Sequence, residues 1–199
     1  MNTKNNLPLI KKENVIEFKF ITKHDLYSTK WIHWSRKYEY PITIDYIKKN
    51  RPKSIHNTSC GGLNSKDCLH LTFCEEISEL CDNTIHSDIW ETHGAPKKPS
   101  NGNFKFYDIT KSYEPNNKFD MVINLSTLEE LNNKDRNLAF VNLYNQVNDG
   151  GTLFLTLDYP DVDIKWIENI VGKKVESNYW KRIYNRKKKL SVILLIITK

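Results

Sequence analysis

Segments with the patterns of strands and helices alternate along this chain from about residue 50 to its end, and this order limits the fold more than any other feature. Strand-like stretches lie at 54–59, 83–90, 104–110, 118–126, 152–160, 173–180 and 190–198. Alternation of strands with helices is typical of a parallel sheet covered by helices on both faces. We therefore predict a three-layer α/β sandwich around a mostly parallel sheet of seven strands.

Apolar spacing predicts the helices between these strands. One is expected after the N-cap candidates Asn64 and Ser65, and another after Pro160. A third helix carries a stripe of Leu138, Val141, Tyr144 and Val147 and is expected to end at Gly150 or Gly151. Only the short run 181–189 separates the last two strands, so we expect these two strands to be antiparallel.

Length and composition bound the class of protein. A chain of 199 residues suits one domain with one core, and 39% hydrophobic and 12% aromatic residues exclude a disordered chain. The polar start, MNTKNNLPLIKKEN, lacks the apolar core of a secretory signal, so we expect a cytoplasmic protein. The longest apolar run, 190–198, is about half of what a membrane-spanning helix needs, so we expect no membrane segment.

Cysteine spacing and charge give weaker signals. The spacing of Cys60, Cys68, Cys74 and Cys81 matches no zinc site, so we expect no metal and interpret Cys74 and Cys81 as small buried residues. The net charge of +6 lies partly in the run 181–189, which we interpret as a solvated turn, with nucleic-acid contact as the alternative.

Two sequence segments support a resemblance to a known family. The stretch KFDMVINLSTLEEL, a helix, and then NDGGTLFLTLDYP resemble the fourth strand, fourth helix and fifth strand of the class I S-adenosylmethionine-dependent methyltransferases, which have a Rossmann-like fold. The closing antiparallel strand pair is also similar to that family, in which the last strand inserts beside the fifth. The resemblance implies a Rossmann-like core over 51–199 and an N-terminal extension or lid over 1–50, within one domain of 1–199.

The resemblance also implies a site for S-adenosylmethionine, because ligands of open α/β sheets bind beyond the carboxyl ends of the strands. Asp88 would hold the ribose hydroxyls, Asp108 the adenine amino group, and Ile109 would pack on the adenine ring. The remaining residues implied for the cofactor site are Trp34, Arg36, Asn57, Ser59, Cys60, Gly61, Gly62, Ile89, Asn124, Leu125 and Ser126. Asn57 stands where the family usually has an acid, and the usual three spaced glycines are missing.

Methyl transfer needs mainly proximity and a base for the acceptor's proton. The candidate bases are Glu129, His33 and Asp158, in that order. Each site residue also has a structural interpretation. Asp88 and Asp108 would be turn residues, and Arg36 would pair with Glu39 on a helical turn or point into the cleft.

The function that we expect is methyl transfer to a small-molecule or sugar-like acceptor. A non-catalytic module that keeps the fold is the first alternative, favoured by the divergent glycine loop. A nucleic-acid-binding or nucleic-acid-modifying protein is the second alternative, favoured only by the basic run.

Overall fold

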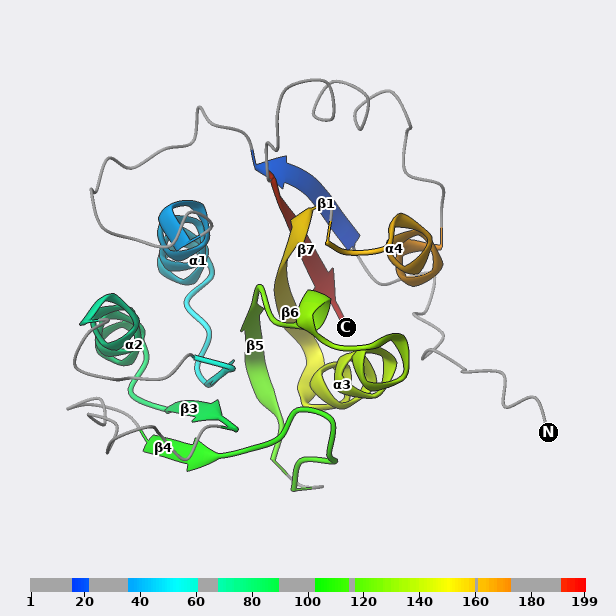
Figure 1. Cartoon of the computed structure of the whole chain (residues 1–199). Coiled ribbons are helices and arrows are strands. Elements are labelled where there is room, and N and C mark those ends of the chain that lie inside the picture. The colour runs from blue at the N-terminus through cyan, green and yellow to red at the C-terminus, as the bar shows by residue number, and fades with distance from the viewer. Residues whose placement is uncertain are drawn as a thin grey trace.

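The structure is a computed structural model that describes residues 16–21, 36–60, 68–89, 103–114, 117–159, 161–172 and 191–199. A twisted sheet runs through the middle of the molecule, with α1 and α2 on one face and α3 and α4 on the other (Figure 1). The predicted α/β architecture is therefore confirmed. Within the described residues, no helix is both long and apolar enough to cross a bilayer.

The sheet has the strand order β1-β7-β6-β5-β2-β3-β4. Its strands are β1 (Ile16–Ile21), β2 (Ile55–Thr58), β3 (Thr84–Asp88), β4 (Asn103–Phe106), β5 (Phe119–Leu125), β6 (Val147–Tyr159) and β7 (Ser191–Thr198). The strands from β4 to β6 pair in parallel, whereas β7 is antiparallel to β6 and to β1. A mostly parallel sheet with an antiparallel C-terminal strand is what the sequence predicts.

The edge strand β1 differs from the expectation. We assigned residues 1–50 to an extension or lid, but Ile16–Ile21 pairs along its length with β7. The sequence IEFKFI alternates apolar and charged residues, which is the period of a half-buried strand, so a local signal was present. The predicted strand at 173–180 lies outside the described residues.

Each face of the sheet carries its own core because successive strand residues point to opposite faces. Val122 and Leu153 pack with residues of α3 (Asn133–Asn145) and α4 (Ile164–Val171). Ile123 and Phe154, one position further along, pack with residues of α1 (Arg36–Asn50) and α2 (Cys68–Leu80). Helices α2, α3 and α4 were predicted from apolar spacing, whereas α1, which shares a face of the sheet with α2, was not.

The buried face of α3 differs from the predicted stripe. Leu138 is 44% exposed, whereas Tyr144 is buried as predicted, together with Ala139, Phe140 and Leu143. A stripe built from steps of three alone drifts around a helix of 3.6 residues per turn, and a mixture of steps of three and four is needed to stay on one face.

The two glycines expected to end that helix lie in β6 instead. The helix ends at Asn145, with Gln146 as its C-cap. A Cβ at Gly151 would lie 2.8 Å from the backbone oxygen of Asp120, so this position needs glycine for the close approach of β5 and β6. The burial predicted for two cysteines is confirmed, because Cys74 and Cys81 are 0% and 7% exposed.

Candidate functional site

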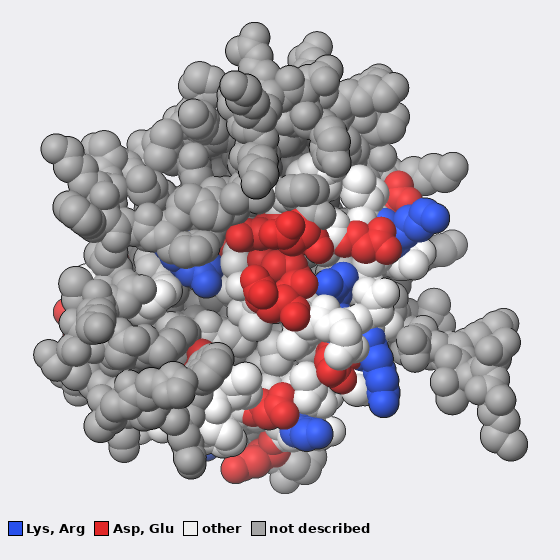
Figure 2. Space-filling model, viewed as in Figure 1, with Lys and Arg blue, Asp and Glu red and all other residues white. Residues whose placement is uncertain are grey.

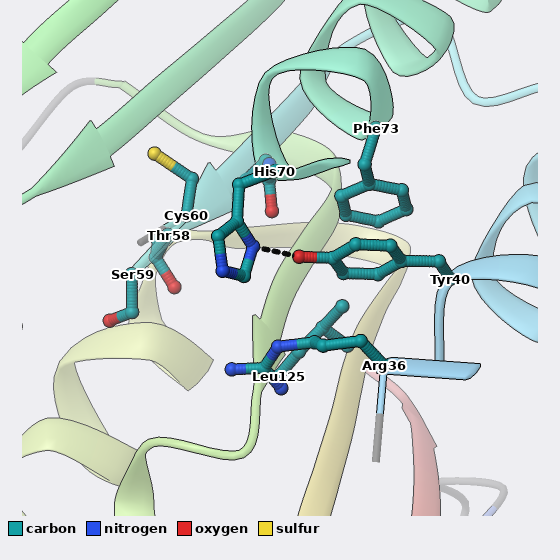
Figure 3. Close-up of a pocket in the computed structure, with 9 residues that line it drawn as sticks. Arg36, Tyr40, Thr58, Ser59, Cys60, His70, Phe73 and Leu125 are labelled. Atoms are coloured by element: carbon teal, nitrogen blue, oxygen red, sulfur yellow. Dashed lines mark hydrogen bonds between the residues drawn. The ribbon is translucent and has the colours of Figure 1, made fainter. Parts of the chain in front are cut away.

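A pocket lies where the order of the strands reverses. The chain passes from β2 outward to β3 and β4, and then returns to place β5 on the other side of β2. Ligands of open α/β sheets bind at this switch point, beyond the carboxyl ends of the strands. The pocket is lined by Arg36, Tyr40, Asn57, Thr58, Ser59, Cys60, His70, Phe73 and Leu125 (Figure 3). Of the residues predicted for the cofactor, five line the pocket: Arg36, Asn57, Ser59, Cys60 and Leu125. Thr58 lines it as well but was not predicted.

Two serines turn the chain sharply at the carboxyl ends of the neighbouring strands β2 and β5. Ser59 follows β2 with φ of 52°, and Ser126 follows β5 with φ of 41°. A non-glycine residue in the left-handed region costs roughly 1–3 kcal/mol, and such residues gather at functional sites. Asn124 joins the two strand ends, because its Nδ2 donates to Thr58 Oγ1 at 3.1 Å and to Ser59 Oγ at 3.2 Å.

Aromatic side chains from the first two helices form one wall of the pocket. The rings of Tyr40 and Phe73 are stacked, with centroids 3.8 Å apart, and the Tyr40 hydroxyl contacts Nδ1 of His70 (Figure 3). The cavity volume of the pocket is only about 10 Å³, close to what a single water molecule needs. Pockets that enclose a drug-sized ligand hold ~300–1,000 Å³, so a nucleoside requires this aromatic wall to move outward.

An acidic cluster, which we define as Glu39, Glu129 and Asp158, lies beside the pocket. Glu39 is fully buried, and its carboxylate accepts hydrogen bonds from Arg36, Ser126 Oγ and, at 2.5 Å, Thr156 Oγ1. Asp158 Oδ1 lies 2.9 Å from Ser126 Oγ.

Asp158 also connects to the third member of the acidic cluster, because its backbone N–H donates to Glu129 Oε1 at 2.8 Å. The cluster thus links α1, the short helix η2 (Leu128–Glu130) and the end of β6. Acidic side chains also gather on the surface over the carboxyl ends of β5 and β6 and over η2 (Figure 2).

Ser126 links two members of the cluster, because its Oγ contacts both Glu39 and Asp158. Its single hydroxyl hydrogen is donated to one of them at a time. Burial, and then the charge of Glu39, raises the pKa of Asp158 to about 6. Burial, followed by the charges of Asp158 and Glu39, raises the pKa of Glu129 to about 8.

The pairing expected between Arg36 and Glu39 is confirmed. Burial alone would lower the pKa of the Arg36 guanidinium, but Glu39 and further acidic neighbours raise it above its usual range. The contacts from Glu39 to Ser126 and Thr156 were missed, because they join residues 87 and 117 positions apart and have no local pattern.

The glycine loop is only partly described. Gly61 and Gly62 lie outside the described residues, as do Trp34 and His33. The backbone N–H of Cys60 donates to Ser87 O at 3.2 Å, so it is not open to a ligand as we expected. Asn57 is buried, with Nδ2 at 3.1 Å from His86 Nδ1, and its side chain serves the packing between β2 and α2.

Asp88 and Asp108 follow adjacent strands. Asp88 ends β3 opposite Phe106, is 5% exposed, and precedes Ile89, which is 50% exposed. Asp108 Oδ1 accepts from Thr110 N at 2.9 Å and from Thr110 Oγ1 at 2.7 Å, as in the structural interpretation of this residue. Ile109 is buried in the core beneath α3. None of these four predicted residues lines the described pocket.

Comparisons with known proteins find similarity in structure alone. No family model matches the sequence, and no curated protein matches it. The N-methyltransferase NodS from Bradyrhizobium japonicum WM9, in complex with S-adenosyl-L-homocysteine, is similar with a TM-score of 0.54 and 11% identity, over 82% of this chain and 86% of that one.

Two further structures agree with this result. A S-adenosylmethionine-dependent methyltransferase from Clostridium acetobutylicum ATCC 824 has a TM-score of 0.53 and 13% identity, over 80% of this chain and 90% of that one. Magnesium protoporphyrin IX methyltransferase from Synechocystis PCC 6803 has a TM-score of 0.51 and 13% identity, over 87% and 91%. The chain therefore has the Rossmann-like fold of the class I S-adenosylmethionine-dependent methyltransferases.

Proposed function

We propose that this protein is a methyltransferase that uses S-adenosylmethionine to methylate a small-molecule or sugar-like acceptor. The observation that carries the proposal is the pocket at the switch point between β2 and β5, which is lined by the left-handed residue Ser59 and by Leu125 at the end of β5. In a sheet of this topology the switch point is where a nucleotide-like ligand binds.

The residues at this edge of the sheet fit such a cofactor. Asp88, at the end of β3, would hold the ribose, and the half-exposed Ile89 would contact the adenine ring. Asn124 Oδ1 is buried without a partner, which suits a ligand that donates a hydrogen bond near Ser59. S-adenosylmethionine supplies an electrophilic methyl group on a sulfonium. NodS and the Synechocystis enzyme were each solved with S-adenosyl-L-homocysteine, which supports this choice of cofactor.

The protein's own groups would act by position and by proton transfer. Displacement at a methyl carbon needs the acceptor held in line, to which the pocket walls contribute. Asp158, with a pKa of about 6, and Glu129, with a pKa of about 8, both titrate close to neutral pH, so either carboxyl group can exchange a proton there. Asp158 and Glu129 lie next to each other, joined by the hydrogen bond from the Asp158 backbone N–H, and neither of them lines the pocket. The third candidate, His33, lies outside the described residues.

A non-catalytic module is the second candidate. It is favoured by Asn57, which stands where the family has an acid and contacts His86, and by the Cys60 amide, which donates within the protein. Such a module would keep the fold and the buried core but would bind the cofactor poorly.

Calorimetry with S-adenosyl-L-homocysteine separates the two candidates. We expect the wild-type chain to bind the ligand, and Asp88→Asn to weaken binding by roughly 10-fold or more, because a charge-assisted hydrogen bond is worth ~1.5–3 kcal/mol. Asp82→Asn is the matched control, since Asp82 is an exposed acid just before β3. Absence of heat at millimolar ligand would reject the methyltransferase and favour the module.

A further inference from the structure

We propose that the acidic cluster selects an acceptor whose nucleophile is a primary amine, with Glu129 and Asp158 binding its ammonium form and Glu129 taking its proton. This inference rests on the proposed function, because it concerns the second substrate of the same site. It is argued from charge, from unpaired acceptors and from the place of the cluster next to the pocket.

The cluster has more carboxyl groups than cations. Its three members come from α1, η2 and β6, and the salt bridge recorded for them is the one from Arg36 to Glu39. Asp161 adds a further negative charge that acts on Asp158. The Arg136 guanidinium of α3 is used elsewhere, since it donates to the backbone oxygens of Leu128, Glu129 and Leu131. Among the described residues, Arg36 is therefore the one cation recorded beside these three carboxyl groups, so negative charge is in excess.

The described residues leave three buried side-chain atoms without a hydrogen-bond partner: Tyr113 Oη, Asn124 Oδ1 and Glu129 Oε2. The last two are acceptors, and both belong to the end of β5 or the turn that follows it. Asn124 is 0% exposed and Glu129 is 9% exposed, so water does not readily satisfy them. A buried acceptor without a donor costs ~1–3 kcal/mol, which a bound donor would recover.

The number of donors distinguishes an amine from a hydroxyl. An ammonium group has three N–H donors and no acceptor, whereas a hydroxyl has one donor and two lone pairs. The cluster offers Glu129 Oε2 and the Asp158 carboxylate, both of which accept. A metal ion is a poorer occupant, because no group of three His, Cys, Asp or Glu in the described part of the chain is placed to hold one.

The cluster continues directly from the pocket. Arg36 lines the pocket and pairs with Glu39, and Leu125 lines the pocket and precedes Ser126. An amine held by the cluster would therefore face a methyl group held above β2 and β5. The ammonium first gives one proton to the ionised Glu129. The nitrogen lone pair then forms the N–C bond as the C–S bond breaks, and the sulfur keeps that electron pair, so the products are a methylated ammonium and S-adenosyl-L-homocysteine.

Nuclear magnetic resonance of glutamate side-chain carboxyls tests the inference without knowledge of the natural acceptor. The full chain, labelled with ¹³C at the glutamate carboxyls, is titrated from pH 5 to 10 with propylammonium chloride, with propanol or with potassium chloride. Glu129→Gln identifies the Glu129 signal by its loss. We expect propylammonium to lower the Glu129 midpoint by about 1–3 pH units, because an opposite charge nearby favours the ionised carboxyl. Propanol and potassium should leave it unchanged.

Matched variants show whether the cluster is the binding site. Asp158→Asn should weaken the apparent affinity for propylammonium roughly 10–100-fold, read from the same Glu129 signal, whereas Glu130→Gln on the exposed side of η2 should not. Equal midpoints in all three additives, or the same shift with propanol, would overturn the inference.

Two separate measurements distinguish a failure of this inference from a failure of the proposed methyltransferase function. The titration is run with and without S-adenosyl-L-homocysteine, whose binding is measured by calorimetry on the same sample. Binding of this ligand without an ammonium-dependent midpoint rejects the inference alone. An ammonium-dependent midpoint without ligand binding rejects the methyltransferase and leaves a cation site.

Discussion

Replacing Glu129 by glutamine is predicted to stabilise the protein, by an amount that grows with pH. The folded state raises the pKa of this carboxyl from 4.5 to about 8, chiefly through burial. Between these values the unfolded chain has released the proton and the folded chain still binds it, so the stability of the wild type falls as pH rises. Glutamine does not titrate, and its amide oxygen can still accept from the Asp158 backbone N–H.

The size of the effect follows from the two pKa values. They are separated by about 3.5 pH units, and each unit is worth ~1.36 kcal/mol. The difference in unfolding free energy between Glu129→Gln and the wild type should therefore be small near pH 4.5. This difference should grow to about 3 kcal/mol at pH 7 and about 5 kcal/mol above pH 8. Any effect of the substitution on packing adds an amount that does not depend on pH.

Urea unfolding at pH 5, 7 and 9, followed by the fluorescence of the five tryptophans, measures this difference. Glu130→Gln is the control, because Glu130 is the exposed neighbour on the same turn and should show no such growth. A difference that stays constant or shrinks as pH rises would refute the conclusion that Glu129 is a buried, protonated carboxyl.

Two further predictions concern packing. Gly151→Ala should destabilise the protein by about 1–3 kcal/mol in urea unfolding, because its Cβ would lie 2.8 Å from Asp120 O; an unchanged midpoint would contradict the close approach of β5 and β6. Phe140→Ala should lower the unfolding free energy by about 3–5 kcal/mol, whereas Leu138→Ala on the exposed face of α3 should lower it by less than about 0.5 kcal/mol. Thermal unfolding measures both variants, and similar losses of stability in the two would contradict the assignment of the buried face.

The sequence predicted the parts of the fold that depend on local pattern. The continuous apolar runs of β5, β6 and β7 marked buried strands, and their ends placed Ser126, Glu129 and Asp158 near one another, because the carboxyl ends of neighbouring parallel strands meet at one edge. The strand β1 has an equally clear alternation, but we assigned it to an extension because the family resemblance covered only residues 51–199.

The rest of the site depends on contacts that no local pattern encodes. Glu39 completes the acidic cluster only because α1 packs against the sheet above β5 and β6, so its role follows from tertiary structure. The stacking of Tyr40 on Phe73 has the same origin. Asp108 is the opposite case. The family resemblance implied that it binds adenine, whereas its carboxylate makes a local turn contact with Thr110, two residues further along.

A crystal structure with S-adenosyl-L-homocysteine is the most direct test of the account. We predict the ligand's sulfur above the ends of β2 and β5, near Ser59 and Leu125, its ribose on the Asp88 carboxylate, and the ring of Tyr40 moved away from the pocket. A ligand bound elsewhere, or an Asp88 carboxylate still buried among protein atoms with the ligand at saturation, would contradict it.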